Sequence, residues 1–211
     1  MRREKHSAYF NLLDAFKEGC PLCYLAKRSA SRYIDNLLYE HVNDPQIRQK
    51  LRKTMGFCNK HAWQMQKSGE ALGISIIYED LLKVLAAKLE NAKSIRSEGD
   101  ICPACDQQKM SEKRYTLIFI ENMLDHELLN TYINSFGLCL PHLSMVIERC
   151  KDAKTIKKIK DIELKKIDAL IKELEELQRK YDYRFSKEII GKEGTAWIRV
   201  IEKITGKEGV F

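Results

Sequence analysis

Cys20-Pro21-Leu22-Cys23 and Gly56-Phe57-Cys58-Asn59-Lys60-His61 are the stretches that decide the fold of this chain, because each occurs twice. The first recurs as Cys102-Pro103-Ala104-Cys105 and the second as Gly137-Leu138-Cys139-Leu140-Pro141-His142. Two motifs that return in the same order indicate an internal duplication. Six of the seven cysteines fall in this pattern, and Cys150 is left over.

Both repeats are predicted to be helical throughout. Apolar residues recur at helical spacing before and between the motifs. They are Phe10, Leu13 and Phe16 before Gly19; Ile34, Leu37, Leu38, Ile47 and Leu51; and Tyr78, Leu81, Leu82, Leu85 and Leu89 before Gly99. Asp44-Pro45 marks a turn or a new helix start. Thr116 to Ile120 looks strand-like, but it aligns with a helical pattern in the first repeat, so we predict a buried helix and an all-α fold.

A long amphipathic helix is expected after the second repeat. The segment from Lys151 to Lys180 is highly charged, with apolar residues along one side. These are Ile167, Leu170, Ile171, Leu174, Leu177 and Tyr181. A short terminal helix is expected to dock through Trp197. We therefore divide the chain into a first metal-binding repeat (1–99), a second repeat with the long helix (100–185) and a helical tail (186–211).

The duplicated motifs predict two metal sites with three cysteines and one histidine each. Two ligands three residues apart at a helix start point the same way, so each motif supplies half of a tetrahedral site. Pairing the half-sites within each repeat gives two ligand sets. These are Cys20, Cys23, Cys58 and His61, and Cys102, Cys105, Cys139 and His142. We predict one zinc ion in each, and four protein ligands favour a structural role over a catalytic one.

Two other uses of these cysteines are weighed against zinc. Iron–sulfur clusters are also held by cysteine with an occasional histidine, which would make the chain a redox or electron-transfer protein. A Cys-x-x-Cys pair can also serve in thiol redox exchange, but the βαβ pattern that accompanies it in thioredoxin-like proteins is lacking, and the histidine motif would have no explanation.

The order of elements predicts unequal consequences of losing the two sites. The long helix follows the second repeat directly and can support it without metal, whereas the first repeat has no such helix. On this assignment Cys58→Ser is expected to lower thermal stability more than Cys139→Ser.

Composition and charge limit the class of function. The chain has 211 residues and a formal net charge of +7, which favours acidic partners without naming one. Lysine and glutamate mix along the polar face of the long helix, so nucleic-acid binding through Lys151–Lys166 is expected to be weak.

No signal peptide or membrane span is expected, and we predict a cytoplasmic protein. No Ser/His/Asp arrangement, phosphate-binding loop or dinucleotide-binding glycine pattern occurs. We therefore expect a module that binds a protein partner rather than an enzyme, and leave its oligomeric state open.

An arginine–tyrosine pair also repeats, as Arg32-Tyr33 and Arg114-Tyr115. Both pairs lie more than two helical turns beyond the cysteines, too far to ligate the metal. Glu40 and Glu121 are acidic residues to which the arginines are expected to pair in the core.

Several of these stretches resemble a prokaryotic family of unknown function, number 6062. The resemblance rests on the two cysteine motifs of the first repeat and on three further segments and the tail. These are Leu38-Tyr39-Glu40, Val42-Asn43-Asp44-Pro45, Ile76-Ile77-Tyr78-Glu79-Asp80-Leu81-Leu82 and Ala196-Trp197-Ile198-Arg199. It implies that the paired cysteine motifs belong to the family pattern, and it brings no activity with it.

Overall fold

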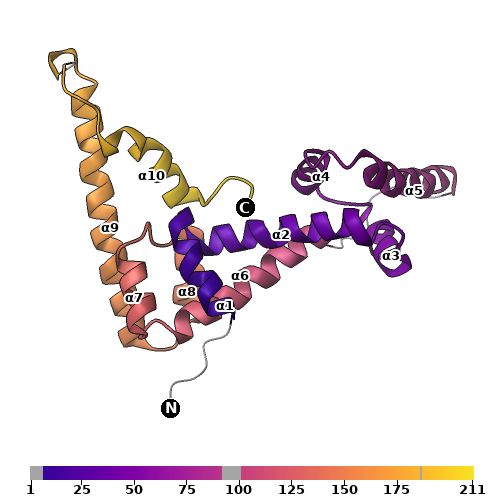
Figure 1. Cartoon of the computed structure of the whole chain (residues 1–211), viewed down its shortest axis with the longest axis horizontal. Helices are drawn as coiled ribbons and strands as arrows, with labels where there is room; N and C mark the ends of the chain where they lie inside the picture. Colours follow the sequence, from indigo (N-terminus) through magenta and orange to yellow (C-terminus); the bar gives the residue numbers. More distant parts are fainter. Residues whose placement is uncertain (1–6, 92–100, 186) are drawn as a thin grey trace. The chain divides into compact units, whose positions relative to one another are not determined.

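The computed structural model describes residues 7–91, 101–185 and 187–211. Over these residues the chain forms ten α-helices and three short 3₁₀ helices, with no strand, which confirms the all-α prediction (Figure 1). The helices are α1 (Ser7–Ala15), α2 (Pro21–Glu40), α3 (Pro45–Thr54), α4 (Asn59–Gln66), α5 (Ala71–Asn91), α6 (Pro103–Glu121), α7 (His126–Ile133), α8 (Leu140–Arg149), α9 (Ala153–Lys180) and α10 (Ala196–Thr205). The predicted helix stop at Gly99 lies outside the described residues.

The chain divides into two compact units. The continuous unit is Ala26–Ser111, and the split unit joins Met1–Leu25 to Glu112–Phe211. The divisions fall inside α2 and α6, so each of these helices belongs partly to one unit and partly to the other. The split unit therefore contains one cysteine motif from each repeat, and so does the continuous unit.

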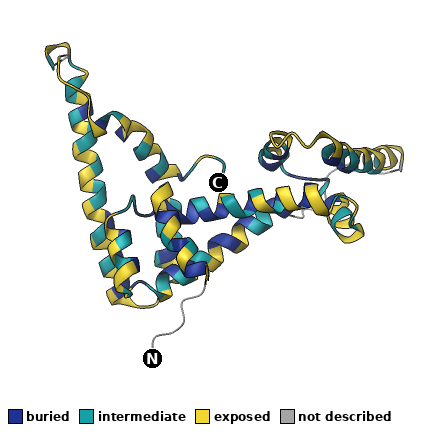
Figure 2. Ribbon diagram, in the orientation of Figure 1, coloured by how far each residue is buried: buried dark blue, intermediate teal, exposed yellow. Residues whose placement is uncertain are grey.

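The core of the continuous unit forms where the sequence predicts helical faces. Ile34 and Leu37 of α2, Leu51 of α3 and Ile77 and Leu81 of α5 are all buried against one another. Figure 2 shows buried and exposed residues alternating along these helices, as amphipathic helices require.

Of the turn or helix start predicted at Asp44-Pro45, the structure shows the helix start, at the beginning of α3. The Asp44 carboxylate accepts hydrogen bonds from the backbone N–H groups of Gln46 and Ile47, at 2.8 and 3.1 Å. Pro45 occupies the first turn, where its missing N–H has no partner to lose. The second of the two predicted alternatives, a new helix, is thus the one observed.

Asp80 joins α5 to α3 through two arginines. Its carboxylate accepts from Arg52 at 2.6 and 2.7 Å and from Arg48 at 3.3 Å. The guanidinium groups hold the pKa of Asp80 far below its ordinary value, and the hydrogen bonds from Arg52 contribute most. Burial of the carboxylate acts in the opposite direction with a smaller effect. The side chain of Asp80 is 12% exposed, so the charged pair is only partly screened by water.

The core of the split unit is aromatic. Phe16 follows α1, Phe119 lies near the end of α6 and Tyr132 lies in α7, with ring centroids 5.1 to 6.3 Å apart. Thr116 and Phe119 are fully buried in α6, which confirms a buried helix from Thr116 to Ile120.

A buried carboxylate holds α9 to its neighbours in the split unit. Glu163 is 1% exposed and accepts hydrogen bonds from the Tyr132 hydroxyl at 2.6 Å and the Leu138 N–H at 2.9 Å. Lys203 of α10 forms an ion pair with the same carboxylate. Gly137 has φ of 87°, and a Cβ there would lie 2.5 Å from a Glu163 oxygen. The glycine of the second histidine motif is therefore required both by its backbone conformation and by this close approach.

The predicted long helix is present as α9, and Asp152 caps its start through the N–H groups of Lys154 and Thr155. Its packing differs from the prediction, because Thr155, Ile159, Glu163 and Leu177 are the buried residues. Of the predicted stripe, Leu177 is buried, Ile167, Leu170 and Leu174 are half-buried, and Ile171 and Tyr181 are exposed.

Two other packing predictions are wrong. Trp197 is 55% exposed and does not dock α10, which instead buries Ala196 and Lys203. The core ion pairs are also wrong, because all four charged side chains, Arg32, Glu40, Arg114 and Glu121, are exposed. Tyr33 has a structural role, since it packs on the core with its ring 6.5 Å from that of Phe57.

We predict that Asp80→Asn lowers the melting temperature by a few degrees, corresponding to about 1 kcal/mol for a partly exposed charged pair. Since the folded-state pKa of Asp80 lies below the unfolded value of about 3.9, its stabilisation is complete above that pH and is lost as pH falls further. Thermal melts of variant and wild type should therefore converge in acid. Glu79→Gln, which removes an exposed pair on the same helix, is the control. An equal effect of both variants at pH 7 would contradict this role for Asp80.

Candidate metal centres

All four half-sites lie at helix starts. The Cys-Pro-x-Cys motifs open α2 and α6, with the proline as the first helical residue. The Gly-x-Cys-x-x-His motifs open α4 and α8, where Cys58 and Cys139 are the N-cap residues with nearly the same backbone angles (φ −64° and −73°, ψ 163° and 161°). Gly56 and Gly137 precede them with φ of 90° and 87°. The duplication seen in the sequence therefore also holds for the local backbone.

The structure brings all eight predicted ligands into two groups. The first cluster consists of Cys20, Cys23, Cys139 and His142, and the second cluster consists of Cys58, His61, Cys102 and Cys105. Within each cluster the candidate ligand atoms all lie within 4.8 Å of one another. The predicted pairing within each repeat is wrong, because each cluster combines the Cys-Pro-x-Cys motif of one repeat with the histidine motif of the other.

Helix length gives the physical reason for this exchange. The chain leaves Cys20 and Cys23 along α2, which has 20 residues and extends about 30 Å. The next helix, α3, has 10 residues and covers about half that distance. The histidine motif that follows α3 lies in the continuous unit together with Cys102 and Cys105, whereas Cys20 and Cys23, at the start of α2, lie in the split unit.

The distances between ligand atoms match a single tetrahedral ion. Zinc–sulfur bonds of about 2.3 Å and zinc–nitrogen bonds of about 2.0 Å place sulfurs about 3.8 Å apart and sulfur and nitrogen about 3.5 Å apart. In the first cluster Cys23 Sγ and Cys139 Sγ are separated by 3.5 Å, and the three sulfurs lie 3.2 to 3.6 Å from His142 Nδ1.

The second cluster has the same geometry. Cys58 Sγ lies 3.6 Å from Cys105 Sγ, and the sulfurs lie 3.3 to 3.6 Å from His61 Nδ1. In both clusters the Nδ1 atom faces the sulfurs. The residues present therefore fit a metal ion with three thiolates and one imidazole.

The surroundings of the two histidines differ. Burial, followed by the charge of Lys60, lowers the pKa of His61 to about 4, so this imidazole is neutral near pH 7. Burial opposes protonation of His142 too, but contacts with Cys139, Cys20 and Glu112 raise its pKa to about 11. A metal ion entering the first cluster must therefore displace this proton, and acid favours loss of the ion.

Thiol acidity also varies within each cluster. Burial alone would raise the pKa of Cys20, but hydrogen bonds with Cys139, Cys23 and His142 lower it well below the ordinary value. In the second cluster, burial and the neighbouring thiol of Cys58 raise the pKa of Cys105 to about 12. Both thiols must be thiolates to bind a metal, so metal binding releases protons.

Glu112 is a contact that the motifs do not reveal. It is 6% exposed and lies on α6, with Oε1 3.7 Å from His142 Nε2, the nitrogen turned away from the sulfurs. A carboxylate in this position orients a metal-binding imidazole and makes it more basic. Its position seven residues beyond Cys105 gives no sequence signal, because the contact depends on how α6 and α8 pack.

The first cluster is also covered by the end of the chain. The Lys207 N–H donates to Cys23 Sγ at 3.4 Å, and the Phe211 ring centroid lies 5.1 Å from that of His142. All four ligands of this cluster are fully buried. In the second cluster His61 is buried, whereas Cys58, Cys102 and Cys105 are half-buried.

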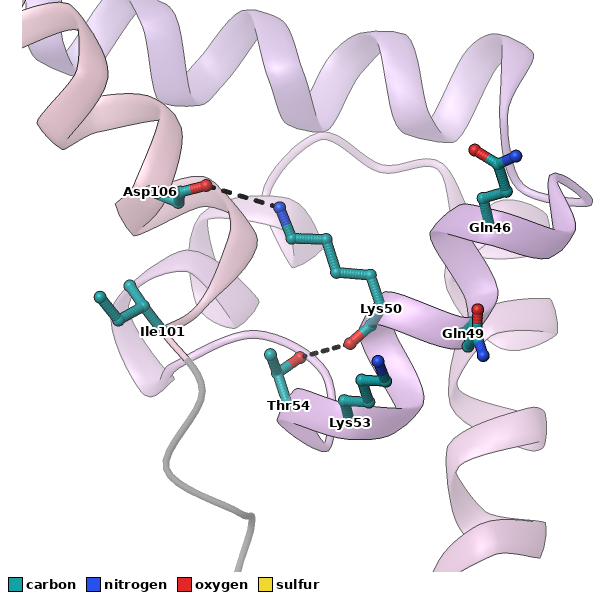
Figure 3. A pocket seen from close by; sticks show the side chains of 7 residues that line it. All are labelled: Gln46, Gln49, Lys50, Lys53, Thr54, Ile101 and Asp106. Atoms are coloured by element: carbon teal, nitrogen blue, oxygen red, sulfur yellow. Dashed lines mark hydrogen bonds and ion pairs between the residues drawn. The ribbon is translucent and has the colours of Figure 1, made fainter.

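A hollow of about 540 Å³ lies beside the turn that carries Cys102 and Cys105. Figure 3 shows its lining, with Lys50 reaching Asp106 at 3.5 Å across one side. The lining residues are Gln46, Gln49, Lys50, Lys53, Thr54, Ile101 and Asp106. Ile101 and Asp106 immediately flank the Cys-Pro-x-Cys motif, so the hollow borders the second cluster along the chain.

Cys150, the seventh cysteine, is buried outside both clusters and contacts the Asp152 carbonyl.

The sequence pattern described as "Family of unknown function (DUF6062)" matches residues 5–99 and 87–209, two overlapping segments that cover nearly the whole chain. The chain belongs to this family. A protein from Caldicellulosiruptor sp. (strain Rt8B.4), described as "Uncharacterized 23.9 kDa protein in xynA 3'region", is 28% identical over 205 residues, spanning 93% of this chain and 100% of that protein. No solved structure matches. None of the described helices combines the length and the apolar character needed to cross a membrane.

We predict that Glu112→Gln weakens zinc binding at the first cluster by about tenfold or more, because the neutral amide polarises His142 less than a carboxylate. Competition with a chromogenic chelator should show the loss in one of two zinc equivalents. Glu121→Gln, an exposed change on the same helix, is the matched control. Unchanged affinity at both equivalents would mean that Glu112 does not act on the histidine.

Proposed function

We propose that this protein is a helical binding module held together by two structural zinc ions, one in each cluster. The observation that carries the proposal is the agreement between the ligand-atom distances and one tetrahedral ion. Four protein ligands leave no open position for substrate or water, which favours a structural ion over a catalytic one.

Iron–sulfur clusters are the alternative cofactor. A cluster with two or more irons distributes its ligands over several metal atoms, whereas here the four ligand atoms of each cluster all lie within 4.8 Å of one another. This compactness favours a single ion, and three thiolates with one imidazole suit zinc. Cysteines that serve as metal ligands must also stay reduced, and this requirement supports a cytoplasmic location.

A protein partner is favoured over nucleic acid by the charges on α9. Glu173 pairs with Lys192 and Arg199, and Glu176 pairs with Arg179. These carboxylates neutralise basic groups beyond Lys166, so the charge that could contact phosphate lies mainly in Lys151–Lys166, and binding to nucleic acid should be weak and lost near physiological salt.

The proposal is tested by elemental analysis of protein purified anaerobically and without chelators. We expect two zinc ions per chain, a colourless solution and no disulfide under reducing conditions. Chelation should lower helicity, measured by circular dichroism, because structural zinc contributes about 10 kcal/mol or more in small domains. A brown, oxygen-sensitive preparation would support iron–sulfur clusters instead, and native-like melting after complete metal removal would exclude a structural role.

The burial of the clusters leads to a stability ranking opposite to the one derived from the order of elements. We predict that Cys139→Ser lowers the melting temperature by about 5 °C more than Cys58→Ser. Loss of a ligand in the first cluster leaves the remaining polar ligands without a full set of partners in a fully buried site. The same site also holds the end of the chain through the Lys207 N–H. Cys150→Ser is the control for loss of a cysteine outside both clusters. The measurement is a thermal melt of each zinc-loaded variant. A lower melting temperature for Cys58→Ser than for Cys139→Ser would support the ranking derived from the order of elements.

A further inference from the structure

The two clusters use the same ligand types but differ in their protection from solvent. The four ligands of the first cluster are fully buried, and the chain end from Lys207 to Phe211 lies against them. In the second cluster the three cysteines retain partial exposure, and the hollow lined by Lys50 and Lys53 borders the same turn (Figure 3). The cysteines of the second cluster are therefore less protected from a small polar reagent than those of the first cluster, which are fully buried.

Exposure matters because a metal-bound thiolate keeps its lone pairs and can be oxidised. Cys58 Sγ and Cys105 Sγ lie 3.6 Å apart; Cys58 is the N-cap residue of α4 and Cys105 lies on the first turn of α6. A disulfide requires these atoms to approach to about 2.05 Å, which a small shift of two helix ends can provide once the metal no longer separates them.

We propose that the second cluster is a peroxide-sensitive zinc–thiolate switch, in which oxidation joins Cys58 to Cys105 and releases its zinc ion. This inference rests on the proposed function, since it requires zinc in that cluster. The first cluster keeps its zinc under the same conditions and holds the split unit folded.

The chemistry balances with hydrogen peroxide as the oxidant. The Cys58 thiolate attacks one peroxide oxygen, the O–O bond breaks, and a sulfenic acid and hydroxide form. The Cys105 thiolate then attacks the Cys58 sulfur, forming the S–S bond and releasing the second oxygen as hydroxide. Two protons convert the hydroxides to water, so two thiolates lose two electrons and the peroxide gains them. Zinc is left with Cys102 and His61, half of its ligands, and dissociates.

The test uses the full-length, zinc-loaded protein, whose metal content is measured first. Hydrogen peroxide is then added in stoichiometric amounts, released zinc is followed with a chromogenic chelator, and disulfides are mapped by mass spectrometry. We expect one of two zinc ions to leave about tenfold faster than the other, with a Cys58–Cys105 disulfide and with Cys20, Cys23 and Cys139 still reduced. A dithiol reductant and added zinc should restore two ions per chain.

Three variants sharpen the result. Cys58→His keeps a four-ligand zinc site but removes one partner of the disulfide, so its second cluster should resist peroxide. Phe211→Ala uncovers His142 and should make the first cluster lose zinc faster than in wild type. Cys150→Ser removes the thiol outside both clusters and should behave as wild type.

The outcomes separate the two proposals. Protein that holds no zinc before peroxide is added contradicts the proposed function. Three other outcomes overturn the proposed switch but not the proposed zinc sites. Protein loaded with two zinc ions could lose both at equal rates, lose the ion of the first cluster first, or form a disulfide other than Cys58–Cys105.

Discussion

The exchange of half-sites between the two repeats is the constraint on which the rest of the structure depends. Each cluster joins a cysteine motif from one repeat to a histidine motif from the other, so neither repeat has a complete site of its own. Closing the first cluster over a sequence separation of 116 between Cys23 and Cys139, rather than 35 between Cys23 and Cys58, costs about 1 kcal/mol more in chain entropy. That cost is small, and the nearer partners, Cys23 and Cys58, belong to different units.

The same constraint explains why buried charge gathers beside the first cluster. Glu163 holds the Leu138 N–H, one residue before the ligand Cys139, and pairs with Lys203 four residues before Lys207, whose N–H reaches Cys23. An unpaired carboxylate in this place would be strongly destabilising, so α9 and α10 must both be in position. The long helix and the tail thus complete the metal centre, although neither contributes a ligand.

The sequence predicts the helices and the eight ligands because both leave local signals. Apolar spacing marks Ile34 and Leu37, and the duplicated motifs mark the ligand residues. The pairing of half-sites could not be predicted, since each repeat contains a complete ligand set and the choice depends on the length and direction of α2. Glu112 and Phe211 were missed for a similar reason, because only tertiary packing brings them to His142. The prediction that Trp197 docks the terminal helix was wrong because an apolar residue on a short helix suggests burial without specifying which face of the helix packs.

Duplication normally produces two equivalent sites, yet here the equivalence ends at the ligands. The first cluster lies in the unit formed by both ends of the chain, so Lys207 and Phe211 can cover it. The second cluster lies in a unit formed by one continuous segment, whose helices leave its cysteines half-buried. A difference in chain connectivity is therefore enough to give identical ligand sets different solvent access. The nested order of the four motifs thus gives one fully buried cluster and one partly exposed cluster without any change in the ligand types themselves.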